Sequence, residues 1–178
     1  MPKAGLDPVR ITSASTSDVP SIRGFILSAW KEAGPNAWGW TGATEESVQE
    51  LASREHLSRL ITNPNVEVFL AREGQQIVGF AADRKESETT IELSGIIVSE
   101  RVTGKGIGNA LMHAAIRAAS AAGFAGIIVK TESFNQRAIG FYEANGFRRS
   151  GSMREVVEGR NVDLIMLRRT LQIESTQS

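Results

Sequence analysis

The sequence of 178 residues contains no cysteine, a single tyrosine and no net charge. The missing cysteine excludes several kinds of site, and the missing net charge argues against certain partners. Without cysteine there is no disulfide, no thiolate ligand for a metal and no cysteine nucleophile. The absence of cysteine does not by itself indicate a cellular compartment. The 20 basic residues balance the 20 acidic ones, which argues against nucleic acid or an anionic membrane surface as the main partner. No apolar run approaches the roughly 18 residues that a membrane-spanning helix needs.

The length of the chain predicts one domain, and its two ends are expected to be flexible. A chain of 178 residues suits a single hydrophobic core, and we expect flexible ends near residues 1–8 and 173–178. Residues 1–20 lack the charged and then apolar order of a signal peptide, so we expect a cytoplasmic protein. His56 and His113 fall in predicted helices without metal-ligand partners, so we expect both to be structural and no metal to be bound.

What the chain does contain is a strand, a glycine cluster and a helix in direct succession over residues 94–123. Residues 96–98 are apolar and β-branched, which predicts a buried strand. Glycine then occupies positions 104, 106 and 108, and apolar residues at 3.6-residue spacing continue as a helix that ends at Gly123. Such a turn exposes backbone N–H groups at the positive end of the helix dipole, which favours a phosphate or pyrophosphate ligand.

Two common phosphate-binding fingerprints do not fit this cluster. The dinucleotide pattern needs a third glycine at position 109, where the chain has Asn109, and the P-loop pattern is absent. On its own the cluster is also consistent with a tight turn that binds nothing.

Hydrophobic periodicity over the rest of the chain predicts a mixed α/β sheet. Pro20 lies in the first turn of a helix capped by Ser17 or Asp18, and Thr44 caps a second helix through about Ile61. A later helix over 135–145 ends at Gly146. The predicted strands are 9–11, 66–71, 77–82, 90–98, 126–131, 147–155 and 162–169. The order is β-α-α-β-β-β-α-β-α-β-β, a mixed β-sheet flanked by helices.

Two segments at a characteristic separation carry a family resemblance. Val98 and Thr103–Gly108, followed by the segment Asn135 to Phe147 with Tyr142 inside it, resemble the Gcn5-related N-acetyltransferase (GNAT) superfamily over residues 66–170. The resemblance implies a single-domain GNAT-like fold and acetyl-CoA as cosubstrate. Thr103 stands where the family has Arg or Gln, and Arg101 offers a match shifted two residues upstream. Because backbone amides carry most of the pyrophosphate binding, we expect Thr103 to weaken the site little.

The resemblance also implies a set of coenzyme-binding residues. They are Ile96, Ile97, Val98, Thr103, Gly104, Lys105, Gly106, Ile107, Gly108, Asn109 and Asn135. Backbone N–H groups of 96–98 would bind the pantetheine arm and the thioester carbonyl where this strand splays from its neighbour. Ser94-Gly95 interrupts the strand, which indicates a bulge or a close backbone approach. Lys105 adds charge or points to solvent, and Asn135 is also a candidate N-cap.

Acetyl transfer to an amine calls for a base and a donor. An amine with a pKa of about 10.4 is almost wholly protonated at pH 7, so it must lose a proton. Glu92 lies at a strand position where the family has a base-like glutamate, and on a regular strand Glu92, Ser94 and Ile96 share one face. The alternative is that Glu92 is an exposed residue at a strand edge or forms a salt bridge, without a role in catalysis. Tyr142, by resemblance, faces the coenzyme sulfur as a hydrogen-bond donor, unless it only packs on its helix.

All three tryptophans lie within eleven residues, at positions 30, 38 and 40. In the resembled family this segment borders the acceptor, so Trp38 and Trp40 are candidates for an aromatic wall against an ammonium group. Packing in the core or a homodimer contact would explain them equally.

These observations predict an acetyl-CoA-dependent N-acetyltransferase that moves the acetyl group directly to a primary amine. Direct transfer follows because no cysteine can carry an intermediate. The acceptor is a small molecule or a protein amine, and the sequence does not separate the two. A non-catalytic acyl-CoA-binding sensor or interaction module remains the alternative; it would keep the glycine loop and dispense with Tyr142.

Overall fold

The computed structural model describes residues 8–33, 43–157 and 159–172. Within these ranges seven strands form one sheet, in the order β1-β2-β3-β4-β5-β7-β6. The strands are β1 Val9–Ser13, β2 Val66–Glu73, β3 Gln76–Lys85, β4 Thr90–Val98, β5 Gly126–Glu132, β6 Arg148–Val157 and β7 Arg160–Thr170. Of the pairings between these strands, only that of β4 with β5 is parallel.

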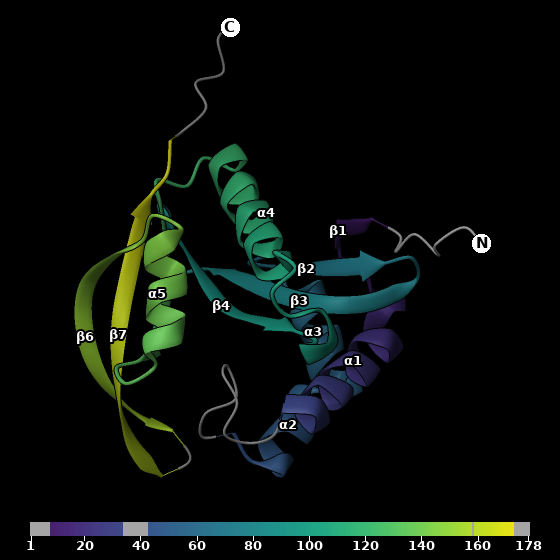
Figure 1. The fold of residues 1–178 in the computed structure, drawn as a ribbon. Coiled ribbons are helices and arrows are strands. Elements are labelled where there is room, and N and C mark those ends of the chain that lie inside the picture. The colour runs from purple at the N-terminus through teal and green to yellow at the C-terminus, as the bar shows by residue number, and fades with distance from the viewer. Residues whose placement is uncertain (1–7, 34–42, 158, 173–178) are drawn as a thin grey trace, which may run out of the picture.

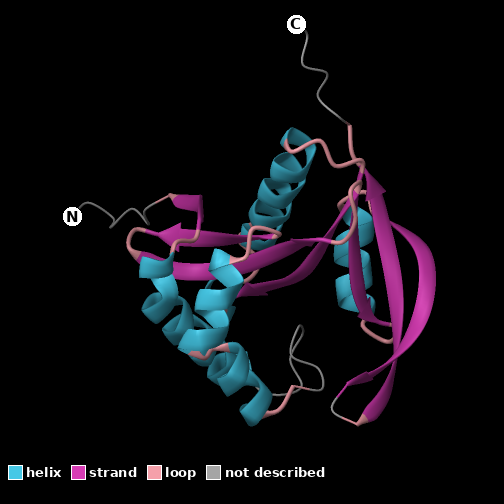
Figure 2. Ribbon diagram, turned by 180° about the vertical axis from the view of Figure 1, so that it is seen from behind, coloured by secondary structure: helices cyan, strands magenta, loops and turns pink. Residues whose placement is uncertain are grey.

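Helices cover both faces of the sheet, as Figures 1 and 2 show. The helices are α1 Val19–Ala33, α2 Glu45–Leu51, α3 Arg54–Thr62, α4 Ile107–Ala121 and α5 Gln136–Ala144. One apolar core lies between the sheet and α4 and α5, where Leu111 and Ile139 are fully buried. The other lies beneath α1 to α3, around Ile22 and Leu57. The predicted fold class, a mixed sheet flanked by helices, is confirmed.

The second predicted helix is two helices, so the predicted element order was wrong by one. Thr44 caps α2 by accepting a hydrogen bond from the Ser47 backbone N–H at 3.1 Å. The helix then stops, and the Ser53 hydroxyl accepts from the His56 backbone N–H at 3.1 Å to begin α3. A serine oxygen that satisfies free N–H groups favours a new helix start over continuation, and the apolar spacing did not reveal this.

The expected irregularity at Ser94-Gly95 is a β-bulge. Ala82 on β3 lies opposite Gly95, but Asp83 lies opposite Leu93, so Ser94 is an extra residue on β4. The Ser94 hydroxyl donates to the Ala82 carbonyl at 2.9 Å. One extra residue reverses the alternation of faces, and Leu93 and Ile96 both join the core under α4. The predicted common face of Glu92, Ser94 and Ile96 is therefore wrong.

The sheet opens between its two parallel strands. β4 pairs with β5 only over Thr90–Glu92, opposite Gly126–Ile128. Beyond this point β5 continues beside β7, while β4 runs toward α1 alongside β3 (Figure 1). Over Leu93–Val98 the edge of β4 that faces β5 has no ladder partner among the described strands. Peptide groups on that edge can therefore bind a ligand.

Several expectations fall outside the described residues. They concern the ends at 1–7 and 173–178 and the tryptophans Trp38 and Trp40. Across the ranges that are described, the helices are too short or too polar for any of them to cross a membrane.

Candidate functional site

The glycine loop between β4 and α4 is shaped to receive an anion. Gly104 and Gly106 have φ angles of 83° and 79°, which glycine adopts at little cost. No atom lies within 4 Å of the position that a Cβ would take on either residue, so the loop is open there. Gly106 is the N-cap of α4, and the first N–H groups of a helix lack intrahelical acceptors. Together these features favour a phosphate ligand.

This loop lines a cavity together with β4 and α5. Nine of the eleven predicted coenzyme residues line it: Ile96, Ile97, Val98, Thr103, Gly104, Gly106, Ile107, Gly108 and Asn109. The other lining residues are Glu100, Val102, Arg137 and Phe141. We call this space the coenzyme cavity.

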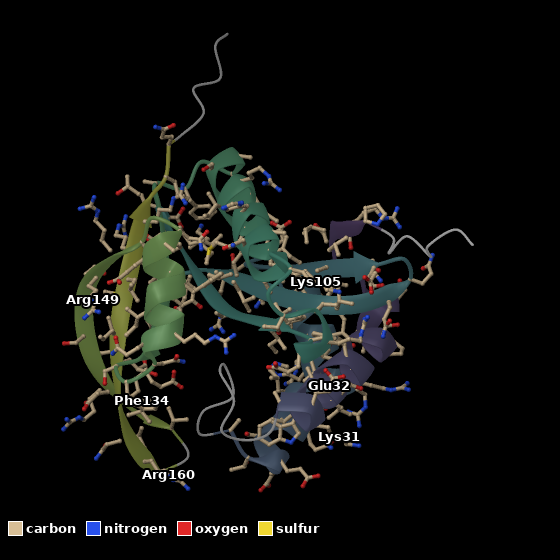
Figure 3. All side chains as sticks on the ribbon, viewed as in Figure 1. Lys31, Glu32, Lys105, Phe134, Arg149 and Arg160 are labelled. Carbon is tan, nitrogen blue, oxygen red and sulfur yellow. The ribbon has the colours of Figure 1, made fainter. Side chains whose placement is uncertain are left out.

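Two predicted side chains in this cavity are engaged elsewhere. The Thr103 hydroxyl donates to the Ser99 carbonyl at 3.2 Å and so closes its own loop. The Asn109 side-chain oxygen accepts from the Asn145 amide at 3.0 Å and joins α4 to the end of α5. Lys105 lies exposed at the start of α4 (Figure 3) and does not line the cavity.

Sequence reasoning missed Arg137 and Phe141 on α5. Both line the coenzyme cavity, and the Phe141 ring lies 3.6 Å from the position of a Cβ on Gly108. Arg137 adds a guanidinium to the cavity, where Glu100 supplies a carboxylate. Their spacing of four residues places them on one face of a helix, a signal that the sequence does contain.

A second cavity is lined by α2, α3, α5 and the strands β3, β4 and β5, and we call it the acceptor cavity, after the ligand that the sequence predicts for this region. Its lining comes from α2 and α3 (Ser47, Val48, Leu51, His56, Leu60), β3 (Phe80, Ala82, Arg84), β4 (Leu93 to Ile97), β5 (Lys130, Thr131, Glu132) and α5 with its N-cap (Asn135, Ala138, Tyr142), and Ala43 precedes α2. Ile96 and Ile97 line both cavities. The end of β4 is therefore where ligands of the two cavities would meet.

Tyr142 is buried in the lining of the acceptor cavity. Its ring packs edge-to-face against Phe141 at 5.4 Å and against Phe147 at 5.7 Å between centroids. Burial raises the pKa of Tyr142 to about 12, and the nearby charge of Glu132 adds to the shift. The hydroxyl therefore stays protonated at neutral pH and keeps a hydrogen that it can donate.

Glu92 does not lie among the described residues that line the acceptor cavity. Its carboxylate accepts a hydrogen bond from the Lys130 ammonium, with 3.2 Å between Oε2 and Nζ, and both side chains are about one-fifth exposed. The carboxylate that does line the cavity is Glu132, which also accepts from the Thr131 hydroxyl at 3.3 Å. The sequence did not single out Glu132.

Asn135 has the capping role that the sequence suggested. Its side-chain oxygen accepts from the Ala138 backbone N–H at 3.1 Å at the start of α5. Asn135 and His56 both line the acceptor cavity.

In the described part of the chain, no three His, Asp or Glu side chains gather as a metal site would require.

The sequence of this chain is similar to an acetyltransferase family and to individual known proteins. Residues 29–147 match the model of the acetyltransferase (GNAT) family. Mycothiol acetyltransferase of Corynebacterium efficiens is 26% identical over 144 residues, which cover 79% of this chain and 47% of that protein. L-methionine sulfoximine/L-methionine sulfone acetyltransferase of Pseudomonas aeruginosa is 28% identical over 176 residues, 94% of this chain and 96% of that protein. The match thus spans about half of the mycothiol enzyme and nearly all of the Pseudomonas enzyme.

Solved structures share the fold at low sequence identity. The ribosomal-protein-S18-alanine N-acetyltransferase of Escherichia coli has a TM-score of 0.71 at 18% identity, covering 96% of this chain and 99% of that one. The PaiA N-acetyltransferase of Thermoplasma acidophilum, solved in complex with coenzyme A, has a TM-score of 0.70 at 20% identity, covering 92% and 99%.

Proposed function

The chain belongs to the acetyltransferase (GNAT) family, and from this premise we propose that it is an acetyl-CoA-dependent N-acetyltransferase acting on a primary amine. The observation that carries the proposal is the end of β4, where Ile96 and Ile97 line both cavities. A coenzyme in one cavity and an amine in the other would meet there, as direct transfer requires. We further propose that the chain is a single domain.

The residues around the coenzyme cavity fit a coenzyme A molecule. The open surface at Gly104 and Gly106 and the start of α4 would hold the pyrophosphate, with Arg137 as a further cation. The unpaired edge of β4 over Leu93–Val98 would hold the pantetheine arm. When bound, the coenzyme supplies the acetyl thioester.

The residues of this chain then have three tasks. Backbone N–H groups on the free edge of β4 donate to the carbonyl oxygen as negative charge develops on it. A carboxylate accepts the proton of the amine as the new C–N bond forms. The Tyr142 hydroxyl donates a hydrogen bond to the sulfur as the C–S bond breaks, without giving up its proton.

Two carboxylates are candidates for the base that removes the proton of the amine. Glu92 was predicted from the sequence, but its carboxylate holds Lys130. Glu132 lines the acceptor cavity and lies close enough to Tyr142 to affect its pKa. We favour Glu132 as the base and keep Glu92 as the competing candidate.

The alternative is a module that binds an acyl-CoA without turning it over. Titration with coenzyme A and an assay of free thiol released from acetyl-CoA, over a panel of amines and peptides, separate the two. Binding together with amine-dependent thiol release supports the enzyme. Binding without thiol release from any acceptor supports the sensor, and absence of binding overturns both.

A further inference from the structure

Arg84 lines the acceptor cavity, and no described carboxylate forms an ion pair with its guanidinium. It is exposed on β3, lines the cavity, and lies directly opposite Glu92 in the β3–β4 register. Glu92 is engaged by Lys130 from the other side. Among the residues that the structure describes, the Arg84 guanidinium has neither an ion pair nor a hydrogen bond.

The charges around the cavity are arranged unevenly. The row Arg84, Glu92 and Lys130 crosses three neighbouring strands and carries one positive charge in excess. Glu132, four residues after Ile128 on β5, supplies negative charge beside Tyr142. His56 is the remaining titratable side chain of the lining besides Tyr142, among the described residues. Among the described residues, the cavity therefore offers the unpaired Arg84 guanidinium on β3 and the Glu132 carboxylate on β5, beside Tyr142.

This pattern is complementary to a zwitterion. An ammonium group near Glu132 would lie beside Tyr142, and a carboxylate of the same molecule would bind the guanidinium of Arg84 in the same cavity. A guanidinium binds a carboxylate through two parallel hydrogen bonds, and these fix orientation as well as affinity. Val48, Leu51 and Leu60 line the remainder with apolar side chains, which suit an uncharged side chain of the ligand.

We propose that Arg84 binds a carboxylate of the acceptor, and that the acceptor is an α-amino acid with an uncharged side chain. The ammonium group of this amino acid gives a proton to Glu132, and the nitrogen forms the C–N bond to the acetyl carbon as the C–S bond breaks. The coenzyme leaves as the thiolate, and the second proton of the nitrogen passes to water. The inference rests on the proposed N-acetyltransferase activity and narrows its substrate class.

The test compares amines that differ only in the carboxylate. Wild-type protein is assayed for thiol release from acetyl-CoA with L-leucine, L-methionine and L-phenylalanine, with their methyl esters and with the corresponding decarboxylated amines. The same ligands are titrated calorimetrically into protein saturated with coenzyme A. Arg84→Gln removes the charge, and Arg84→Lys keeps it without the two-pronged geometry. Arg117→Gln, on an exposed arginine of α4 across the sheet, is the matched control.

We expect wild-type protein to prefer at least one of the three amino acids over its ester and its decarboxylated amine. Arg84→Gln should raise KM for that amino acid by about ten- to a hundredfold, the loss expected for a charge-assisted contact, with kcat little changed. The KM of Arg84→Lys for that amino acid should lie between the KM of Arg84→Gln and that of wild type. KM for the decarboxylated amine should be the same in all variants, and Arg117→Gln should behave as wild type.

Other outcomes separate the two proposals. Acetylation of decarboxylated amines at least as efficient as that of the amino acids would support the acetyltransferase and overturn the amino acid. An amino-acid preference that survives in Arg84→Gln would also overturn the role of Arg84. Binding of amino acids that depends on Arg84, without any turnover, would support the inference and contradict the proposed activity. Neither binding nor turnover of any of the three amino acids would overturn the inference.

Discussion

The Lys130 ammonium on β5 donates to the Glu92 carboxylate on β4 across 3.2 Å, at the point where the two strands separate. Glu92 is the last β4 residue paired with β5. The ion pair therefore links the two sides of the opened sheet just before the gap begins. Since both side chains are mostly buried, removing one would leave the other poorly compensated. Glu92 thus has a structural task that competes with the predicted role as a base.

A matched pair of variants decides which carboxylate removes the proton from the amine. If Glu132 is the base, Glu132→Gln should lower kcat/KM about a hundredfold or more at low pH, where the ammonium form dominates. The deficit should shrink at high pH, where the free amine is already present. Glu92→Gln should instead lower kcat/KM by a factor that does not change with pH. A pH–rate profile of the three proteins with one good acceptor measures this.

The reverse pattern would restore Glu92 as the base. Two variant profiles that overlap the wild-type profile would exclude both carboxylates and leave water as the proton acceptor.

Replacing Tyr142 by phenylalanine removes only the hydroxyl. The ring contacts with Phe141 and Phe147 stay, so the fold and the coenzyme affinity should change little. We expect kcat to fall about ten- to a thousandfold through loss of the donor to the leaving sulfur. Because burial raises the pKa of Tyr142 to about 12, the wild-type rate should show no loss from tyrosine ionisation between pH 7 and pH 10. Turnover of Tyr142→Phe equal to wild type would assign Tyr142 to packing alone.

The glycine loop can be tested with a control that carries the same backbone strain. Gly106 and Gly123 flank α4 at opposite ends, both with positive φ and both with open space at the Cβ position. Alanine at either site should cost about 1–2 kcal/mol of folding stability. Only Gly106→Ala should also weaken coenzyme A binding, by about tenfold or more, because the amides that are proposed to bind phosphate lie there. Equal affinities of the two variants, measured by calorimetric titration, would contradict the assignment.

Asp83 gives the folded protein a dependence on pH that is independent of catalysis. Its side chain is 2% exposed; Oδ1 accepts from the Glu67 backbone N–H at 3.2 Å, and Oδ2 is buried without a partner among the described residues. Burial raises the pKa of Asp83 to about 7, the Glu67 charge adds to this, and the hydrogen bond from Glu67 opposes it. Protonated Asp83 is therefore the form that the fold prefers.

The sign of the effect follows from linkage. An unfolded aspartate has a pKa of about 3.9, so between pH 4 and pH 7 the folded state binds more protons than the unfolded state. The contribution is fully present below pH 4 and is lost as pH rises through 7. Asp83→Asn should raise the free energy of unfolding at pH 8 by about 2–4 kcal/mol and change it little at pH 4.

Urea denaturation at both pH values measures this, with Glu86→Gln, an exposed residue after β3, as the control. A constant difference between Asp83→Asn and wild type at the two pH values would show that Asp83 does not titrate on unfolding.

Local sequence patterns determined most of the secondary structure and one of the two cavities. Strand 90–98 was predicted at the bounds that β4 has, and Gly123 and Gly146 end their helices with positive φ as expected. These features depend on residues close in the chain, on apolar spacing and on the one residue type that tolerates such a backbone. The predicted coenzyme residues other than Asn135 lie in the continuous stretch 96–109, which carries the family resemblance, and nine of them line one cavity.

Tertiary structure alone decided what surrounds the acceptor. Glu92, Lys130 and Arg84 come from three strands. No spacing within one strand shows that Lys130 pairs with Glu92 and that Arg84 has no ion-pair partner among the described residues. The bulge at Ser94 shifts every later β4 residue to the other face, so a regular alternation predicted the wrong one. Charges and faces of this kind are set by strand register, which depends on pairing between distant segments.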